Sequence, residues 1–189
     1  MPYGDRWRKM RRATHDNLNI REAQIYKPMQ EEEASRLLSY FLRDPDDWEQ
    51  HFRRTAASTA MGAIYGRPLV DSSTDAMVAH INELVHTLTR SATPGAHLVE
   101  VFPSMLYIPE CFAKWKRDGK KLHKYWSTVL HDFTMEVQHK AQSGKSLPCL
   151  VANLLENSDK YDMSRHEIAW LAGMLVFAGS ETVTTFLNF

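Results

Sequence analysis

The sequence has 189 residues, 43% of them hydrophobic and 24% charged, which is typical of one globular domain and excludes a disordered segment. Its 23 basic and 23 acidic residues cancel, so there is no broad positive field and we expect no nucleic-acid partner. Two cysteines, Cys111 and Cys149, are too few for a disulfide scaffold, and we recognise no secretory signal or membrane anchor.

The first third of the chain shows helical periodicity, and alternation typical of strands is nearly lacking throughout. The first helix is expected from Asp5, whose side chain can cap it, to about Asn17. A second helix is expected over 29–42. Residues 44–47, Asp-Pro-Asp-Asp, favour the start of a third helix, which should end at Gly66.

Helices are also expected in the middle of the chain. Apolar residues recur at helical spacing over 73–89, which predicts an amphipathic helix. Segment 102–109 is apolar but carries two prolines, so we expect a hydrophobic, partly irregular surface element. A long helix should follow over 111–142, broken at Gly144, and a shorter one over 147–155.

The last helix is expected to start at a capping box, Ser-Arg-His-Glu at 164–167, and to reach the chain end. Its run 168–178 is apolar almost all round but shorter than the ~20 residues that span a bilayer, which predicts a buried helix. Gly179 would let a flat ligand approach the backbone, and a buried Glu181 needs partners or a function. Alternatively, the helix simply emerges into water here, with Glu181 solvated.

The opening helix carries a second candidate site. Trp7 and Arg11 stand four residues apart, so they share one helix face and offer N–H donors to a carboxylate. The cations Arg6, Arg8 and Lys9 crowd the first turn, where the helix dipole disfavours them unless an anion lies nearby. The alternative interpretation is a solvated basic helix start with Trp7 packed in the core.

Together these motifs resemble the cytochrome P450 family. Residues 178–182, Ala-Gly-Ser-Glu-Thr, are similar to the oxygen-binding helix of that family, and Trp7-x-x-x-Arg11 is similar to its haem-propionate helix. Segment 102–117 resembles the substrate-access region of the eukaryotic microsomal branch. The resemblance implies a mainly α, partial cytochrome P450 fold, a helical bundle around the long central oxygen-binding helix, truncated at both ends.

The resemblance also implies a cofactor, haem b, and roles for individual side chains. A haem propionate would be held by a tryptophan and an arginine, because a planar guanidinium is never neutral. Small residues of the last helix would line the haem and oxygen pocket, and an acid–threonine pair would deliver protons. The residues so assigned are Trp7, Arg11, Ala178 and Gly179 for cofactor binding and Glu181 and Thr182 for catalysis.

By the same resemblance, the parent protein would insert one oxygen atom from O2 into a small apolar organic substrate, with electrons from an NADPH-dependent reductase. Residues 77–88 and 102–112 would shape the substrate channel. The basic residues Arg6, Arg8, Lys9 and Arg12 would meet an acidic reductase surface, or they serve only solubility. Full-length relatives would lie on the cytosolic face of the endoplasmic reticulum membrane.

The family's cysteine loop, which supplies the iron ligand, has no counterpart in this sequence. Neither Cys111 nor Cys149 lies in a glycine- and arginine-containing loop, so both are expected to be buried or half-buried structural thiols. We therefore expect 1–189 to be a single partial domain without the haem-cysteine region and inactive alone, since the thiolate drives O–O cleavage. The alternative is a haem-free helical remnant or interaction module without catalytic activity.

Overall fold

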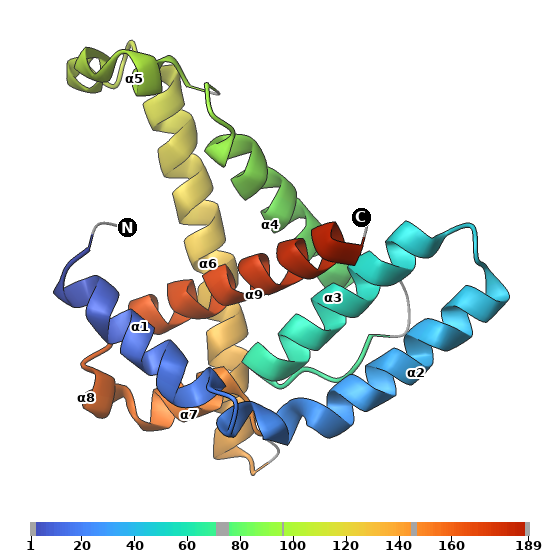
Figure 1. The fold of residues 1–189 in the computed structure, drawn as a ribbon. Helices are drawn as coiled ribbons and strands as arrows, with labels where there is room; N and C mark the ends of the chain where they lie inside the picture. Colours follow the sequence, from blue (N-terminus) through green and yellow to red (C-terminus); the bar gives the residue numbers. More distant parts are fainter. Residues whose placement is uncertain (1–2, 71–75, 96, 145–146, 188–189) are drawn as a thin grey trace.

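The computed structural model describes residues 3–70, 76–95, 97–144 and 147–187, and these ranges contain helices and turns but no strand (Figure 1). The mainly α fold class is thereby confirmed. In chain order the elements are α1 (Asp5–Leu18), η1 (Glu22–Tyr26), α2 (Lys27–Arg43), α3 (Trp48–Tyr65), α4 (Ala76–Ala92), α5 (Leu98–Val101), η2 (Pro103–Tyr107), α6 (Lys114–Gln142), α7 (Leu150–Glu156), α8 (Ser158–Tyr161) and α9 (Arg165–Leu187).

Helix α9 runs through the middle of the bundle, as expected for a helix that is apolar nearly all round (Figure 1). It packs along α3 and crosses α6, and it also contacts α4 and α7. Helix α2 lies on the outer side of α3, and α1 lies beside the start of α9. The long α6 extends away from this body to a tip formed by α5 and η2 (Figure 1).

The predicted helix ends are confirmed where a special backbone conformation sets them. Gly66 ends α3 in the left-handed conformation, with φ 62°. The predicted start at residues 44–47 was slightly early: α3 begins at Trp48, with Asp47 at its N-cap. Asp44, before Pro45, lies outside the helical region with φ −146° and ψ 84°, and the chain turns before the helix begins. Asp5 does not cap α1: it is the first helical residue and pairs with Arg8 at 2.6 Å.

Some elements differ from the expected ones in extent. The short helices η1, α5 and α8 were not anticipated, and α6 begins at Lys114 rather than at Cys111. Residues 73–75, the start of the helix expected over 73–89, lie outside the described residues, and α4 is described from Ala76 onward. Short helices depend on tertiary contacts more than on periodicity, so a pattern of apolar spacing misses them.

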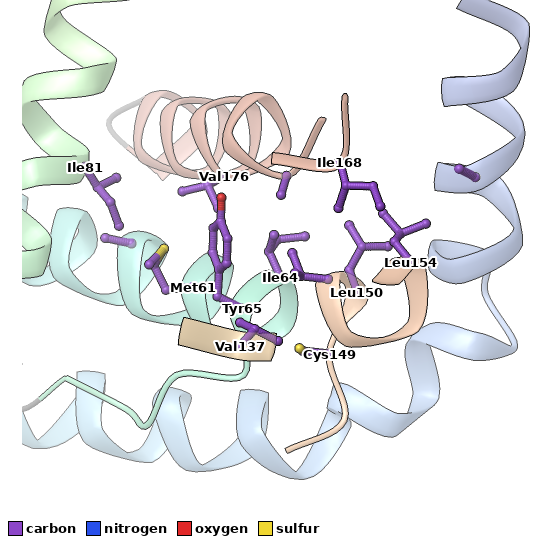
Figure 2. Packing of buried hydrophobic residues seen from close by; sticks show 14 of the residues in the cluster. Met61, Ile64, Tyr65, Ile81, Val137, Cys149, Leu150, Leu154, Ile168 and Val176 are labelled. Atoms are coloured by element: carbon purple, nitrogen blue, oxygen red, sulfur yellow. The ribbon is translucent and has the colours of Figure 1, made fainter. Parts of the chain in front are cut away.

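The hydrophobic core lies where α3, α7 and α9 meet, and Figure 2 shows Met61 and Ile64 of α3 facing Ile168 and Val176 of α9. Helices α6 and α9 cross very closely at Gly173. A Cβ atom built there would lie 2.5 Å from Cδ2 of Leu130. A residue without a side chain therefore allows this crossing.

A buried ion pair joins α2 to α3. The side chains of Glu33 and Arg54 are each 1% exposed, and Nη2 of Arg54 lies 2.8 Å from Oε2 of Glu33. Arg54 also donates to the carbonyl of Val70 at 2.6 Å, and Ser58 donates its hydroxyl to Glu33. The Tyr40 ring lies under the guanidinium, 4.7 Å from its carbon. A desolvated pair of this kind is stable only because these partners surround it.

The tip confirms the predicted hydrophobic, partly irregular element at 102–109. Exposed large apolar side chains gather on α5, η2 and the turn after them: Leu98, Val101, Phe102, Leu106, Tyr107 and Phe112.

Two cations of α6 hold the backbone of this segment. Lys116 donates to the carbonyls of Leu106 and Ile108, at 2.6 and 2.8 Å. Arg117 donates to those of Glu110 and Cys111, at 2.6 and 2.7 Å. Within the described ranges, no helix has the length and apolarity needed to cross a membrane.

A candidate cofactor cleft between α1 and α9

The start of α9 is built as the sequence predicted. Ser164 and Glu167 form a capping box, in which the backbone N–H of Ser164 donates to Glu167 and the N–H of Glu167 donates to the Ser164 hydroxyl, at 3.0 and 3.2 Å. The same carboxylate receives two cations from α1. Nζ of Lys9 lies 3.1 Å and Nε of Arg6 3.5 Å from its Oε1. Two of the crowded cations of the first helix, Arg6 and Lys9, therefore fix α1 against the start of α9.

Burial alone would raise the pKa of Glu167, but the Ser164 hydrogen bonds and the Lys9 ammonium outweigh it, so its pKa lies below 4.5. A carboxyl whose pKa is lowered by folding stabilises the fold above its unfolded pKa and loses that contribution as the pH falls. We expect Lys9→Met to lower the free energy of unfolding at neutral pH, and this difference should shrink as the pH falls below about 4.5.

Urea unfolding at several pH values measures this dependence. Lys27→Met is the control, because Lys27 pairs with Glu31 at 3.9 Å on an exposed surface, where an ion pair contributes about 0–1 kcal/mol. A Lys9→Met penalty that stayed constant down to pH values well below 4.5 would contradict the assigned role of Glu167.

A cleft of about 770 Å³ opens between α1, the start of α9 and the middle of α6. Helix α1 lines one side at successive turns, with Trp7, Arg11 and His15 four residues apart. Helix α9 lines the other side with apolar side chains that include Leu171 and Met174. The remaining lining residues are Arg6, Met10, Thr14, His123, His166 and Trp170.

The arginines in the lining of this cleft, Arg6 and Arg11, both come from α1, and no lining residue is acidic. The Arg11 guanidinium lies over the Trp7 ring, 5.4 Å from its centroid. This contact fixes the orientation of the arginine side chain in the cleft. The cleft therefore suits a ligand with an apolar body and an anionic group.

The far corner of the cleft was not predicted from the sequence. His123 of α6 stacks on Trp170 of α9, with ring centroids 5.0 Å apart and planes at 14°. The Trp170 indole donates to the Ser127 hydroxyl at 3.2 Å, and the His166 ring lies 6.3 Å from that of His123. His123 and Ser127 share one face of α6, and His166 and Trp170 share one face of α9, because each pair stands four residues apart. The two pairs are distant in the chain, with Ser127 and Trp170 43 positions apart, so helical spacing does not predict that they meet.

The motif at 178–182 lies just beyond the lining of the cleft. Ala178 follows the cleft residue Met174 by one helical turn, about 6 Å along the axis, and its side chain is exposed. Thr182 is a turn further on, also exposed, and it donates its hydroxyl to the Ala178 carbonyl. Met174 of the cleft wall, Ala178 and Thr182 therefore lie on consecutive turns of α9.

The other two predicted site residues of the motif, Gly179 and Glu181, lie differently. A Cβ built at Gly179 would meet the Ala60 side chain at 3.8 Å, so the bare side of this glycine faces α3 rather than α1. Glu181 is half-buried and does not line the cleft with Trp7 and Arg11. The structure therefore brings Trp7 and Arg11 to the wall of α9 but not into contact with the acid–threonine pair.

Neither cysteine lines the cleft. Cys149 is buried at the start of α7, where its Sγ accepts the N–H of Ala152 at 3.5 Å, and burial raises its pKa. The expectation of a buried or half-buried thiol was wrong for Cys111, which is exposed in the turn after η2, away from the core.

Comparison with known proteins gives one consistent result. The family model described as Cytochrome P450 matches residues 1–189. Cytochrome P450 monooxygenase 58 of Postia placenta is 40% identical over 186 residues, which is 98% of this chain and 35% of the relative. A cytochrome P450 monooxygenase of Armillaria gallica is 40% identical over 96% of this chain and 35% of the relative.

A more distant relative, cytochrome P450 monooxygenase fogE of Aspergillus ruber, is 31% identical over 96% of this chain. The chain spans about a third of the length of these curated relatives, since it covers 34–35% of each. No solved structure matches significantly. With a family model that covers every residue, the chain belongs to the cytochrome P450 family.

Proposed function

We propose that the protein containing this chain is a haem-dependent monooxygenase, which inserts one oxygen atom from O2 into a small apolar organic substrate with electrons from an NADPH-dependent reductase. This chain would contribute one wall of the site for haem b. The family match and the monooxygenase names of relatives that are 40% identical support the activity. The cleft between α1 and α9 supports the place of the cofactor.

The lining of the cleft fits the edge of a haem. A porphyrin has a flat apolar body and two propionates, and pockets of about 300–1,000 Å³ take ligands of this kind. Arg11 and Trp7 would donate to a propionate, and Leu171 and Met174 would pack against the ring. The observation that carries the assignment is the cationic α1 face opposite an apolar α9 face, with no carboxylate in the lining.

The haem would supply the O2 activation that protein side chains cannot perform. The chain's own residues would exclude water and position protons. Exposed Ala178 leaves room beside α9 for a flat ligand. The Thr182 hydroxyl hydrogen is engaged by the Ala178 carbonyl, so the oxygen lone pairs of Thr182 would accept a hydrogen bond. Glu181, half-buried next to it, would be the proton source.

Surfaces outside the cleft would serve the remaining parts of the proposal. The apolar tip and α4 would border the substrate path and lie toward the cytosolic face of the endoplasmic reticulum membrane. The cations of α1, Arg6, Arg8, Lys9 and Arg12, would meet a reductase. Arg6 and Lys9 also pair with Glu167, and Arg8 pairs with Asp5.

Replacing Arg11 by methionine tests the cofactor site. We expect the full-length protein to bind haem about 10- to 100-fold more weakly, because a hydrogen bond to a charged group contributes about 1.5–3 kcal/mol. Haem titration followed by Soret absorbance measures the affinity. Arg12→Met is the matched control, since Arg12 is exposed on the same helix and does not line the cleft.

If both substitutions weakened haem binding equally, the cleft would not be the haem site. A full-length protein that binds no haem at all would instead support the haem-free helical module.

A further inference from the structure

The far corner of the cleft, formed by His123, His166 and Trp170, has no part in the haem contacts proposed for α1. Its two histidines come from different helices, α6 and α9, and their ring centroids lie 6.3 Å apart. Both histidine side chains are exposed, and both line the cleft. One ligand in the cleft can therefore contact both rings.

The orientation of the His123 ring is fixed by its neighbour. It stacks on the Trp170 ring, with centroids 5.0 Å apart and planes at 14°. The Trp170 indole is held in turn by the Ser127 hydroxyl, to which it donates at 3.2 Å. Stacking occupies a face of the imidazole and leaves the two nitrogens at its edge able to form hydrogen bonds.

The hydrogen-bonding capacity of this corner is not used by the protein itself. The side chains of His123 and His166 make ring contacts but no hydrogen bond within the part of the chain that the structure describes. Even a neutral imidazole carries one N–H donor. None of the described residues that line the cleft is acidic, so the acceptor for these donors must come with a ligand.

We propose that the far corner binds the carboxylate of an organic substrate whose remaining part is apolar. His123 and His166 would each donate an N–H to it, and hydrogen bonds of about 2.9 Å leave space for one carboxylate between rings 6.3 Å apart. A zinc ion would need about four ligands, whereas two donors suffice for a carboxylate. The apolar side chains of α9 that line the cleft would contact the rest of the molecule. Calling this ligand the substrate rests on the proposed function.

A haem propionate has the same chemistry as a substrate carboxylate. The two propionates of a haem project from one edge of the ring, and the proposed function places that edge at Trp7 and Arg11 of α1. The far corner is built instead by α6 and α9. We therefore assign it to the substrate, and the experiment separates the two carboxylates.

Isothermal titration calorimetry of the haem-loaded full-length protein tests this site. The probes are para-butylbenzoate and decanoate, each compared with its uncharged primary amide. We expect each acid to bind about 10-fold more tightly than its amide, because hydrogen bonds to an ionised acceptor are stronger than neutral ones. His123→Phe and His166→Phe should each remove this preference, since phenylalanine keeps an aromatic ring but has no N–H. His131→Phe is the matched control and should retain it, because His131 is exposed on α6 and does not line the cleft.

Two results would overturn the proposal. One is equal affinity for acid and amide in the unsubstituted protein. The other is an acid preference that survives both histidine substitutions, as expected if the two rings serve only to pack α6 on α9. Haem titration followed by Soret absorbance should give the same haem affinity for His123→Phe as for the unsubstituted protein. If that substitution weakens haem and acid binding together, the corner holds a propionate and the assignment to a substrate is wrong. A protein that prefers the acid but binds no haem would refute the proposed monooxygenase and leave the carboxylate site standing.

Discussion

Replacing Arg54 by methionine is expected to lower the free energy of unfolding by about 3–5 kcal/mol, because it leaves the buried Glu33 carboxylate without its cation. Both side chains are 1% exposed, so water cannot take the place of the guanidinium. The carboxylate would keep the Ser58 hydroxyl, and the Val70 carbonyl would lose its Arg54 donor. Chemical denaturation followed by circular dichroism measures the loss.

The adjacent Arg53 provides a matched control. It pairs with Glu49 at 2.7 Å in an exposed i, i+4 geometry, and exposed helix pairs of this kind contribute about 0.3–0.5 kcal/mol. Arg53→Met should therefore have nearly no effect. The double substitution Glu33→Met with Arg54→Met should cost less than the two single losses added together, because no unpaired charge remains. Additive losses would mean that the pair acts only by packing.

Replacing Gly173 by valine is expected to lower the free energy of unfolding by about 1–3 kcal/mol, the usual cost of overpacking a core. Its first side-chain atom would lie 2.5 and 2.6 Å from the two methyl carbons of Leu130. Leu130 is itself buried, so its methyl groups have little room to move. Helices α6 and α9 would have to separate at the point where they cross.

The control for this substitution is a glycine in α6 with open surroundings. Nothing lies within 4 Å of a Cβ built at Gly119, so Gly119→Ala should raise stability by up to about 1 kcal/mol through helix propensity. Thermal unfolding should show a lower melting temperature for Gly173→Val and an unchanged or higher one for Gly119→Ala. A stabilising Gly173→Val would mean that the two helices do not depend on this contact.

Sequence periodicity predicted most helices because apolar spacing reports directly on which face is buried. The same periodicity did not predict the buried ion pair. Glu33 and Arg54 count as polar in such a pattern, and their burial depends on how α2 packs against α3. One end of α3 was predicted and the other was not. The helix ends at Gly66 because of that residue's own left-handed conformation, whereas its start depends on the turn that follows Pro45.

In the candidate site, too, the sequence predicted relations within one helix but not the packing between helices. Trp7 and Arg11 share a face because they stand four apart, and that relation needs no tertiary structure. Their position opposite Leu171 and Met174 depends on how α1 docks on α9, through Lys9 and Glu167. The roles assigned to Ala178, Gly179, Glu181 and Thr182 by resemblance remain predictions.

The four carbonyl contacts of Lys116 and Arg117 make the apolar tip and the first turn of α6 one mechanical unit. Helix α6 continues without interruption from these two residues to Ser127, which holds the Trp170 indole in the cleft. A displacement of the tip must therefore either break those contacts or move α6 with it. If α6 moves, the hydrogen bond between Ser127 and the Trp170 indole in the cleft is strained by a change at the distant tip.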